Sequence, residues 1–87
     1  MPWSPAYTPT FKRDFKNLSP QNQKRVEAAI NDILGSDEPR SLGRPKLGKW
    51  HGAHGYDIGR DIRVLYSVED TEQRVIFLRC GPHPIYQ

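Results

Sequence analysis

Hydrophobic side chains recur with two different periods along this chain of 87 residues. In the last third, residues 57–68 and 75–80 are rich in β-branched and aromatic side chains, and a polar segment at 69–74 separates them. Segments of this composition favour strands, and a short polar link between two of them favours an antiparallel hairpin. We therefore expect the centre of the fold to be a sheet built on these two strands.

Polar side chains interrupt both predicted strands. Because successive side chains of a strand point to opposite faces, Ile62, Val64 and Tyr66 share one face and Arg63 lies on the other. Arg79 interrupts the second strand. We therefore expect Arg63 and Arg79 to share one open face of the sheet.

A helical period replaces the strand pattern in the first third of the chain. Apolar residues spaced for one face of a short helix are Phe11, Phe15 and Leu18. Thr8 or Thr10 can cap this helix, and Pro9 suits its first turn, where the missing N–H is no loss.

Ser19-Pro20 repeats the same start signal and predicts a second helix. Its apolar face is formed by Val26, Ala29, Ile30, Ile33 and Leu34, and Gly35 suits a left-handed C-cap. Because the link between the helices is short, we expect an antiparallel helical hairpin that lays one apolar face on the sheet.

The middle of the chain lacks a steady period. Residues 36–48 indicate a loop that ends in a short strand around 47–50, and residues 50–56 a turn or ribbon that leads into the strand at 57. Ala6-Tyr7 indicates an edge strand. Helices followed by strands favour an α+β fold, with an N-terminal helical hairpin packed on one face of a small antiparallel, twisted sheet. At this length, residues 1–87 are expected to form one domain.

The net charge of +3 conceals an uneven distribution. Residues 40–63 hold six basic and two acidic side chains, whereas the rest of the chain holds seven basic and eight acidic ones. Concentrated positive charge favours a polyanionic partner such as nucleic acid, and a solvated basic face is the alternative.

The single cysteine, Cys80, cannot form an internal disulfide, and its apolar strand predicts a buried, reduced thiol. The sequence shows no basic-plus-apolar leader and no apolar run long enough to cross a bilayer. We therefore expect a cytoplasmic protein that does not act at a membrane.

Several common catalytic motifs are absent from the sequence, namely a phosphate-binding loop, a dinucleotide glycine fingerprint and a nucleophile elbow. His51 and His54 are spaced like metal ligands, but a third ligand is hard to find, because Cys80 is expected in the core and His83 is remote. We therefore expect no metal and no cofactor.

Another set of residues suits metal-free RNA cleavage. That reaction needs a base for the 2′-hydroxyl, cations around the crowded phosphorane and an acid for the departing 5′ oxygen. His83 can carry a proton near neutral pH, and Tyr86 can stack on a base, hold the scissile nucleotide or assist proton transfer. Cations that can meet phosphate oxygens are Arg63, Arg79, Lys46 and Lys49, with His51 nearby in the loop.

Each of these residues also has a simpler interpretation. His83, between two prolines, can be an exposed spacer, and Tyr86 can cover an edge of the core. The strand arginines can form ordinary ion pairs across the sheet, with Asp57, Asp61 or Glu72. Their joint occurrence is what favours the functional interpretation.

Four segments together resemble the RelE/ParE superfamily of toxin–antitoxin toxins. Residues 7–14 resemble its opening strand and helix, 47–52 its leucine-and-glycine loop, 59–66 its glycine, arginine, valine, tyrosine strand, and 79–86 its closing strand and tail. The resemblance covers nearly the whole chain. It implies an α+β fold related in shape to microbial ribonucleases, mRNA cleavage on the ribosome for the RelE and YafQ branches, and a cognate antitoxin.

The resemblance also implies roles for single residues. Arg63 falls on the strand arginine of RelE-like nucleases, His83 on the tail position where RelE has arginine and YafQ histidine, and Tyr86 on the tail tyrosine. Asp61 falls near an aspartate that YafQ-like members use, whereas Asp57 stands where those members place a second histidine. That departure leaves the general base unidentified.

The leading hypothesis is a type II toxin that cleaves mRNA in the ribosomal 30S A site, without a metal, to a cyclic phosphate and a free 5′-hydroxyl. The predicted catalytic residues are His83, Arg63, Arg79, Tyr86 and Asp61, and the predicted substrate contacts are Lys46, Lys49, His51, Arg44 and Arg60. Two alternatives remain, namely a ParE-like, non-enzymatic inhibitor of DNA gyrase and an inactive module that binds RNA or antitoxin.

Overall fold

The computed structural model describes residues 3–46 and 48–82. The helices of this part are α1 (Pro9–Lys16) and α2 (Pro20–Gly35), and two 3-10 turns, η1 (Pro39–Leu42) and η2 (Gly48–Trp50), follow them. The strands are β1 (Ser4–Tyr7), β2 (Arg44–Pro45), β3 (His54–Ile58), β4 (Ile62–Glu69) and β5 (Arg74–Pro82).

The strands form one sheet in the order β1-β5-β4-β3-β2. β4 pairs antiparallel with β3 and β5, and β2 pairs antiparallel with β3, as expected of consecutive strands joined by short turns. β1 comes from the other end of the chain and lies parallel to β5. The predicted α+β fold is confirmed, and β1 makes its sheet mixed rather than purely antiparallel.

Both helices begin where the sequence predicts. The Thr8 hydroxyl accepts a hydrogen bond from the N–H of Phe11 (3.0 Å), the Ser19 hydroxyl accepts one from Asn22 (3.2 Å), and a proline follows each cap. The predicted left-handed cap at Gly35 is wrong. Gly35 is the last residue of α2, its φ is not positive, and the C-cap Ser36 is extended.

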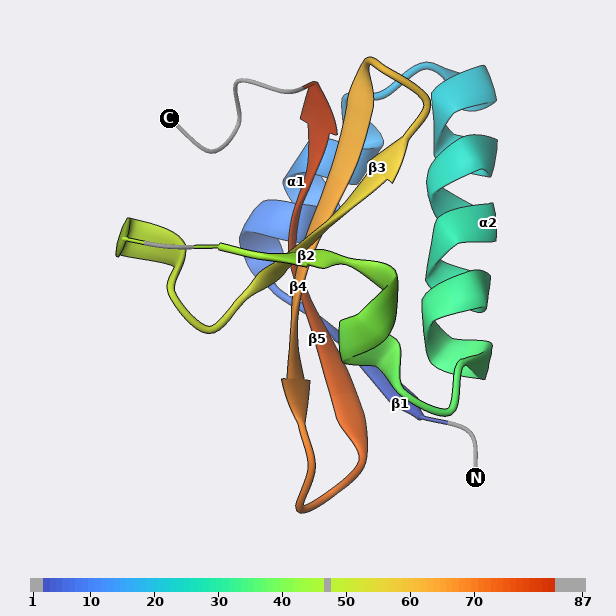
Figure 1. The fold of residues 1–87 in the computed structure, drawn as a ribbon. Coiled ribbons are helices and arrows are strands. Elements are labelled where there is room, and N and C mark those ends of the chain that lie inside the picture. The colour runs from blue at the N-terminus through green and yellow to red at the C-terminus, as the bar shows by residue number, and fades with distance from the viewer. Residues whose placement is uncertain (1–2, 47, 83–87) are drawn as a thin grey trace.

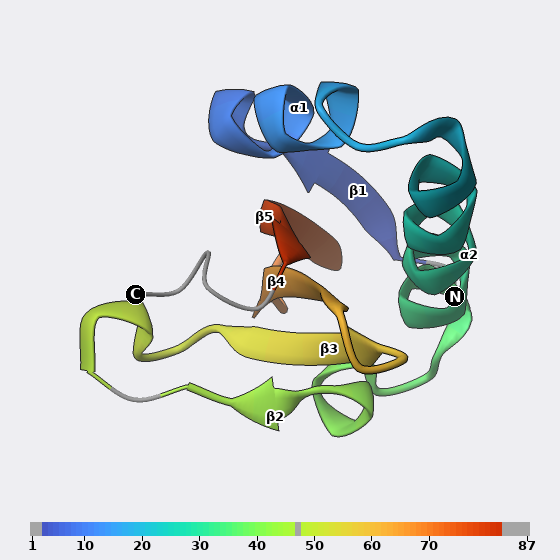
Figure 2. The ribbon, with the colours of Figure 1, turned by 90° about the horizontal axis from the view of Figure 1, so that it is seen from above.

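The two helices share one core but cover different parts of the sheet. α2 runs along one face, and α1 lies over the edge formed by β1 and β5 (Figures 1 and 2). The core between them contains Phe11 of α1, Val26, Ala29, Ile30 and Ile33 of α2, and Ile62, Val64, Tyr66, Val75, Phe77 and Cys80 of the sheet. We call the sheet face that α2 covers the covered face, and the opposite one the helix-free face.

A β-bulge sets which residues of β5 reach the core. Leu65 pairs with Arg79 and Tyr66 with Phe77, so Leu78 is an extra residue in β5. Simple alternation would put Cys80 on the face opposite Phe77, yet both side chains are buried in the same core. The bulge also turns Arg79 away from the core, onto the face that carries Arg63.

The region predicted as a single strand from residue 57 is in fact a hairpin. β3 already begins at His54, and a turn at residues 59–61 separates it from β4. Gly59 adopts φ +62° in this turn, and a Cβ there would lie 2.8 Å from Nη2 of Arg25. The turn therefore needs glycine both for its backbone and for the close approach of the α2 arginine.

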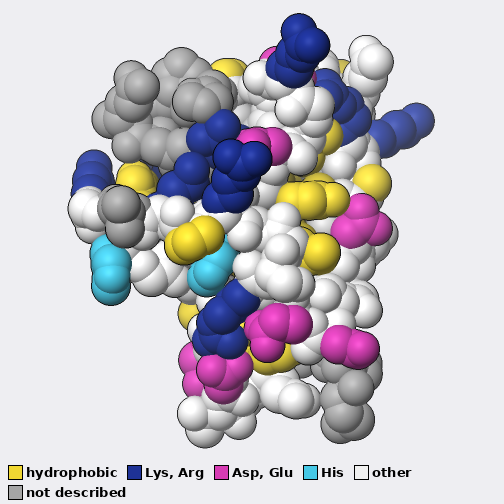
Figure 3. All heavy atoms as spheres, in the orientation of Figure 1, with side chains coloured by type: hydrophobic (Ala, Val, Ile, Leu, Met, Phe, Trp, Pro, Cys, Tyr) yellow, Lys and Arg dark blue, Asp and Glu magenta, His cyan; other side chains and the backbone are white. Residues whose placement is uncertain are grey.

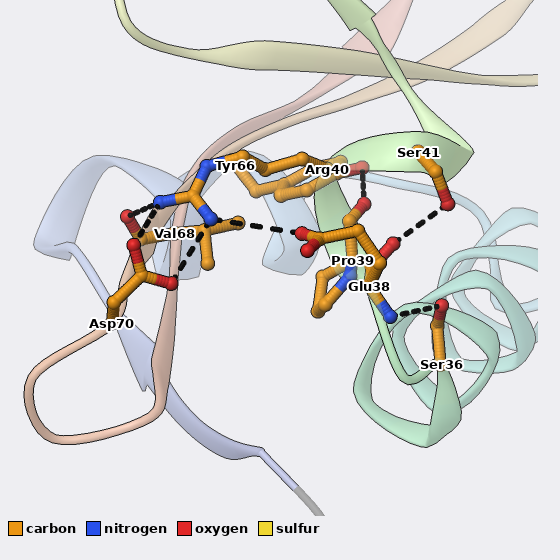
Figure 4. A network of polar contacts seen from close by, with 8 residues as sticks. All are labelled: Ser36, Glu38, Pro39, Arg40, Ser41, Tyr66, Val68 and Asp70. Atoms are coloured by element: carbon orange, nitrogen blue, oxygen red, sulfur yellow. Dashed lines mark hydrogen bonds and ion pairs between the residues drawn. The ribbon is translucent and has the colours of Figure 1, made fainter.

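The connection from α2 to β3 contains more structure than the predicted loop. Arg44–Pro45 form the short strand, not residues 47–50, where η2 lies and where Leu47 is outside the described residues. η1 is fixed to β4 by the buried Tyr66 hydroxyl, which donates to the Pro39 carbonyl (2.6 Å), and by Arg40, which pairs with Asp70 (Figure 4).

No helix among residues 3–46 and 48–82 is long and apolar enough to cross a membrane.

Candidate active site

The β3–β4 hairpin carries the central part of the site, and α2 holds it in place. Nη2 of Arg25 donates to the Ile58 carbonyl and to Oδ1 of Asp61, each at 3.1 Å. Nη1 of the same residue donates to Asn22 within α2 (3.0 Å). Arg25 lowers the pKa of Asp61, mainly through this hydrogen bond. Asp61, a predicted catalytic residue, is therefore anchored to the helix that supports the turn.

Arg63 and Asp57 face each other across β3 and β4. The register pairs them directly, on the helix-free face, and Nε of Arg63 donates to Oδ1 of Asp57. The arginine side chain is 16% exposed and the aspartate side chain 45% exposed. The pair is therefore accessible mainly through its carboxylate.

Lys46 adds a second cation to this pair. Its N–H donates to the Ala53 carbonyl (2.9 Å), which closes the loop between β2 and β3 and holds Lys46 at the sheet. The pKa of Lys46 is lowered by burial first and then by the positive charges of Arg63 and Arg44, while Asp57 acts in the opposite direction. The side chains of Lys46, Arg63 and Asp57 are therefore close enough to influence one another electrostatically.

A hollow of about 290 Å³ opens beside the Arg63–Asp57 pair, lined by Asp57, Gly59, Arg60, Asp61, Ile62 and Arg63. In the space-filling view, Lys and Arg side chains gather around an acidic side chain in the upper part of the molecule (Figure 3). The structure thus brings four predicted or neighbouring site residues, Arg60, Asp61, Arg63 and Asp57, to one concave surface.

Lys49 and His51 lie further out. Both are exposed, in η2 and the turn that follows it, and this connection projects beyond the sheet (Figure 2). Nζ of Lys49 is 5.6 Å from the centre of the Trp50 ring. Arg44 lies exposed on β2, the edge strand. These residues can extend a basic surface outward from the hollow.

Arg79 is held by α1 instead of facing the hollow with Arg63. Its Nε and Nη2 donate to the two carboxylate oxygens of Asp14, each at 3.0 Å, and the Cys80 N–H donates to Asp14 Oδ2 at 3.3 Å. The Asp14 side chain is 14% exposed. This ion pair binds the end of β5 to α1, beyond the last residue that β1 covers.

Two predicted catalytic residues, His83 and Tyr86, lie outside the described residues. His54 belongs to β3 and pairs with Tyr66, so it is part of the sheet rather than of a polar loop. Its ring lies 5.8 Å from the Tyr66 ring, and burial lowers its pKa.

Sequence reasoning missed three residues of this region, Asp57, Arg25 and Asp14. The sequence predicts Asp57 only as an ion-pair partner of a strand arginine or as a departure from the resembled family, and the cross-strand register is what places it beside Arg63. Had the turn between β3 and β4 been placed at residues 59–61, the alternation of side chains along the two strands would have put Asp57 on the same face as Arg63. The contacts of Arg25 with Asp61 and of Asp14 with Arg79 span 36 and 65 residues of chain, and nothing in the sequence pattern pairs them.

No protein-family model matches the sequence. The chain is 32% identical over 80 residues to Toxin RelG of Mycobacterium tuberculosis. The aligned region covers 91% of this chain and 88% of that protein. A chain of the RelBE2 toxin–antitoxin complex from the same organism has a TM-score of 0.72 at 28% identity, covering 95% of this chain and 100% of that one.

Two Escherichia coli toxins share the fold at lower identity. A double mutant of RelE in the free state has a TM-score of 0.77 at 16% identity, covering 97% of this chain and 86% of that one. YafQ has a TM-score of 0.73 at 16% identity and covers 93% of each chain.

Proposed function

This chain belongs to the RelE/ParE superfamily of toxins of toxin–antitoxin systems, and from that premise we propose that it cleaves mRNA on the ribosome as an endoribonuclease. The observation that carries the proposal is the cluster of Arg63, Asp57 and Lys46 beside a hollow on the helix-free face. Cleavage of mRNA would inhibit translation and make the protein toxic.

The cluster has the charge that a phosphodiester needs. Cleavage by the 2′-hydroxyl concentrates negative charge on the phosphorane oxygens, and fixed cations beside them stabilise that charge more than they stabilise the bound substrate. Arg63 offers the forked donors that match phosphate oxygens, and Lys46 adds a point charge. A bound phosphate would also relieve the repulsion that lowers the pKa of Lys46. These side chains suit a reaction that uses no metal ion.

The remaining predicted residues extend this site. We assign Arg60 and Arg44 to contacts with neighbouring phosphates, and exposed Lys49 and His51 to contacts further along the RNA. His83 would act as general acid or base and Tyr86 would position the substrate. Asp61 would act indirectly, because Arg25 holds it in the turn that presents Arg60 and Arg63. For Arg79, the bidentate contact with Asp14 favours a structural role over direct contact with phosphate.

The second partner we propose is a cognate antitoxin. Solved structures similar to this chain include toxin–antitoxin complexes from Mycobacterium tuberculosis and Escherichia coli, which supports the same type of regulation here. A small protein encoded beside this chain and copurifying with it would be the expected antitoxin.

The test is cleavage of a defined mRNA by purified protein, with and without programmed ribosomes and with and without EDTA. We expect new ends in the ribosomal A site, carrying a cyclic phosphate and a 5′-hydroxyl, unchanged by EDTA. Arg63→Gln should reduce the single-turnover rate about 10²–10³-fold, the usual effect of removing one donor to transition-state charge. Intact mRNA together with inhibited gyrase supercoiling would instead identify a ParE-like inhibitor and overturn the proposal.

A further inference from the structure

We propose that Asp57 is the general base of this toxin, the group that removes the proton from the attacking 2′-hydroxyl. This inference deepens the proposed ribonuclease function and rests on it. It follows from the placement of Asp57 relative to the cations of the helix-free face and from the partners of the other aspartates.

The geometry puts one carboxylate oxygen of Asp57 at the surface of the basic cluster. Oδ1 accepts the hydrogen bond from Nε of Arg63, and within residues 3–46 and 48–82 no hydrogen bond is made to Oδ2 of Asp57. The side chain is 45% exposed and lines the hollow together with Arg60 and Arg63. A proton acceptor is therefore present at the position where Arg63 and Lys46 would hold a phosphate.

The neighbouring aspartates are committed to other contacts. Both oxygens of Asp61 meet the guanidinium of Arg25, at 3.1 and 3.4 Å, on the side of the turn that faces α2. Both oxygens of Asp14 meet Arg79, and one of them also accepts the Cys80 N–H. Asp57 is thus the carboxylate near the hollow with an oxygen left over for a substrate.

The contact with Arg63 serves the same step. It fixes the carboxylate in one orientation beside the guanidinium. A guanidinium carries five N–H donors, so a phosphate and an aspartate can share it. The base and the phosphate-binding cation are therefore held together as one unit across β3 and β4.

In the proposed step, Oδ2 of Asp57 takes the 2′-hydroxyl proton as O2′ forms its bond to phosphorus. The bond from phosphorus to O5′ breaks, its electron pair stays on O5′, and a general acid, assigned above to His83, protonates that oxygen. The products are a 2′,3′-cyclic phosphate and a free 5′-hydroxyl, and Asp57 then returns its proton to water. No oxidant, reductant or further reactant is required.

Asp57→Asn separates basicity from positioning, because an amide oxygen can still accept from Arg63 but the side chain cannot take up a proton. On the purified full chain with programmed ribosomes, we expect the single-turnover cleavage rate to fall about 10²–10⁴-fold, the usual contribution of a general base. Affinity for the same RNA, measured by fluorescence anisotropy with the uncleavable 2′-deoxy analogue, should change less than threefold. Asp70→Asn, which alters another aspartate–arginine pair remote from the hollow, is the matched control and should cleave like the wild type.

The second readout is the pH dependence. An imidazole gains its proton at a higher pH than a carboxylate, near 6.5. In Asp57→His the rate should therefore recover partly and rise through about pH 6.5, a rise that Asp57→Asn should lack. A purely structural role for Asp57 would not produce this rise.

The outcomes separate this inference from the function on which it rests. If the wild type cleaves mRNA and Asp57→Asn cleaves it at the same rate, Asp57 is not the general base, but the protein is still a ribonuclease. An Asn variant that loses RNA affinity while keeping its single-turnover rate, or an Asp57→His variant whose rate does not rise near pH 6.5, would lead to the same conclusion. A wild type that leaves mRNA intact would overturn both.

Discussion

Neighbouring residues of β4 serve opposite purposes on the two faces of the sheet. Val64 and Tyr66, on the covered face, are fully buried against the helices. Arg63, between Val64 and Ile62, points to the helix-free face and forms an ion pair with Asp57. One strand therefore supplies both the apolar contacts that stabilise the fold and the cation assigned to the substrate.

The difference between the two faces explains how a small protein can hold a cluster of charged side chains and still be stable. The covered face buries Tyr66 and Cys80, both uncharged at neutral pH, and burial raises the pKa of each to about 12. The helix-free face gathers cations that repel one another. Because α2 packs on one face of the sheet, the buried core and the charged cluster around Arg63 lie on opposite sides of a single sheet.

Removing a core side chain from the covered face should have the largest effect on the free energy of unfolding. Phe77→Ala takes away a buried ring that contacts Phe11, Tyr7 and Tyr66, with centroids 5.7, 5.4 and 6.3 Å away. We expect the free energy of unfolding to fall by about 3–5 kcal/mol, measured by urea denaturation. Arg63→Gln, on the opposite face, should lower it by less, because the carboxylate of its Asp57 partner is 45% exposed and stays hydrated. A similar loss in both variants would contradict the division between the faces.

Alkaline pH should weaken the covered face without any substitution. The folded state raises the pKa of Cys80 from 9.0, and that of Tyr66 from 10.0, to about 12 in each case. The unfolded chain therefore loses these protons first, so stability is fully present below about pH 9 and is lost as the pH rises toward 12. The loss is on the order of 4 kcal/mol for Cys80 and on the order of 3 kcal/mol for Tyr66. Urea unfolding from pH 8 upward should show it, with a flatter curve for Cys80→Ala.

Asp14→Ala tests whether the ion pair between α1 and Arg79 of β5 stabilises the fold. It removes a largely buried carboxylate that accepts from Arg79 and from the Cys80 N–H. We expect a loss of about 2–3 kcal/mol in the free energy of unfolding, because hydrogen bonds to a charged group are lost and donors remain unpaired. Asp57→Ala is the matched control on the helix-free face and should lose less, because the Asp57 side chain is 45% exposed and that of Asp14 only 14%. Equal losses would mean that the Arg63 pair is as structural as the Arg79 pair.

The smallest expected effect concerns the charge of Lys46. Because its pKa is lowered, mainly by burial, Lys46 loses its charge at a lower pH than an ordinary lysine, and its contribution to RNA binding should weaken as the pH is raised. Lys46→Arg keeps the charge, so its affinity for RNA relative to that of the wild type should be higher at pH 9.5 than at pH 7. Fluorescence anisotropy at both pH values measures this, and identical ratios at the two pH values would refute it.

The sequence by itself determined the local features of this protein. Thr8 and Ser19 cap the helices, the apolar period gives α2 its buried face, and alternation separates Arg63 from Val64 and Tyr66. Each of these depends on residues a few positions apart, within one element, so the pattern contains it.

The tertiary structure alone decided which distant residues meet. The bulge at Leu78 places Cys80 beside Phe77 in one core, and Arg79 pairs with Asp14 of α1, 65 residues away in the chain. The hairpin register set Asp57 opposite Arg63. Periodicity records which side of an element is buried, but it contains neither the register between strands nor the pairing of charges far apart in the chain, and the candidate site depends on both.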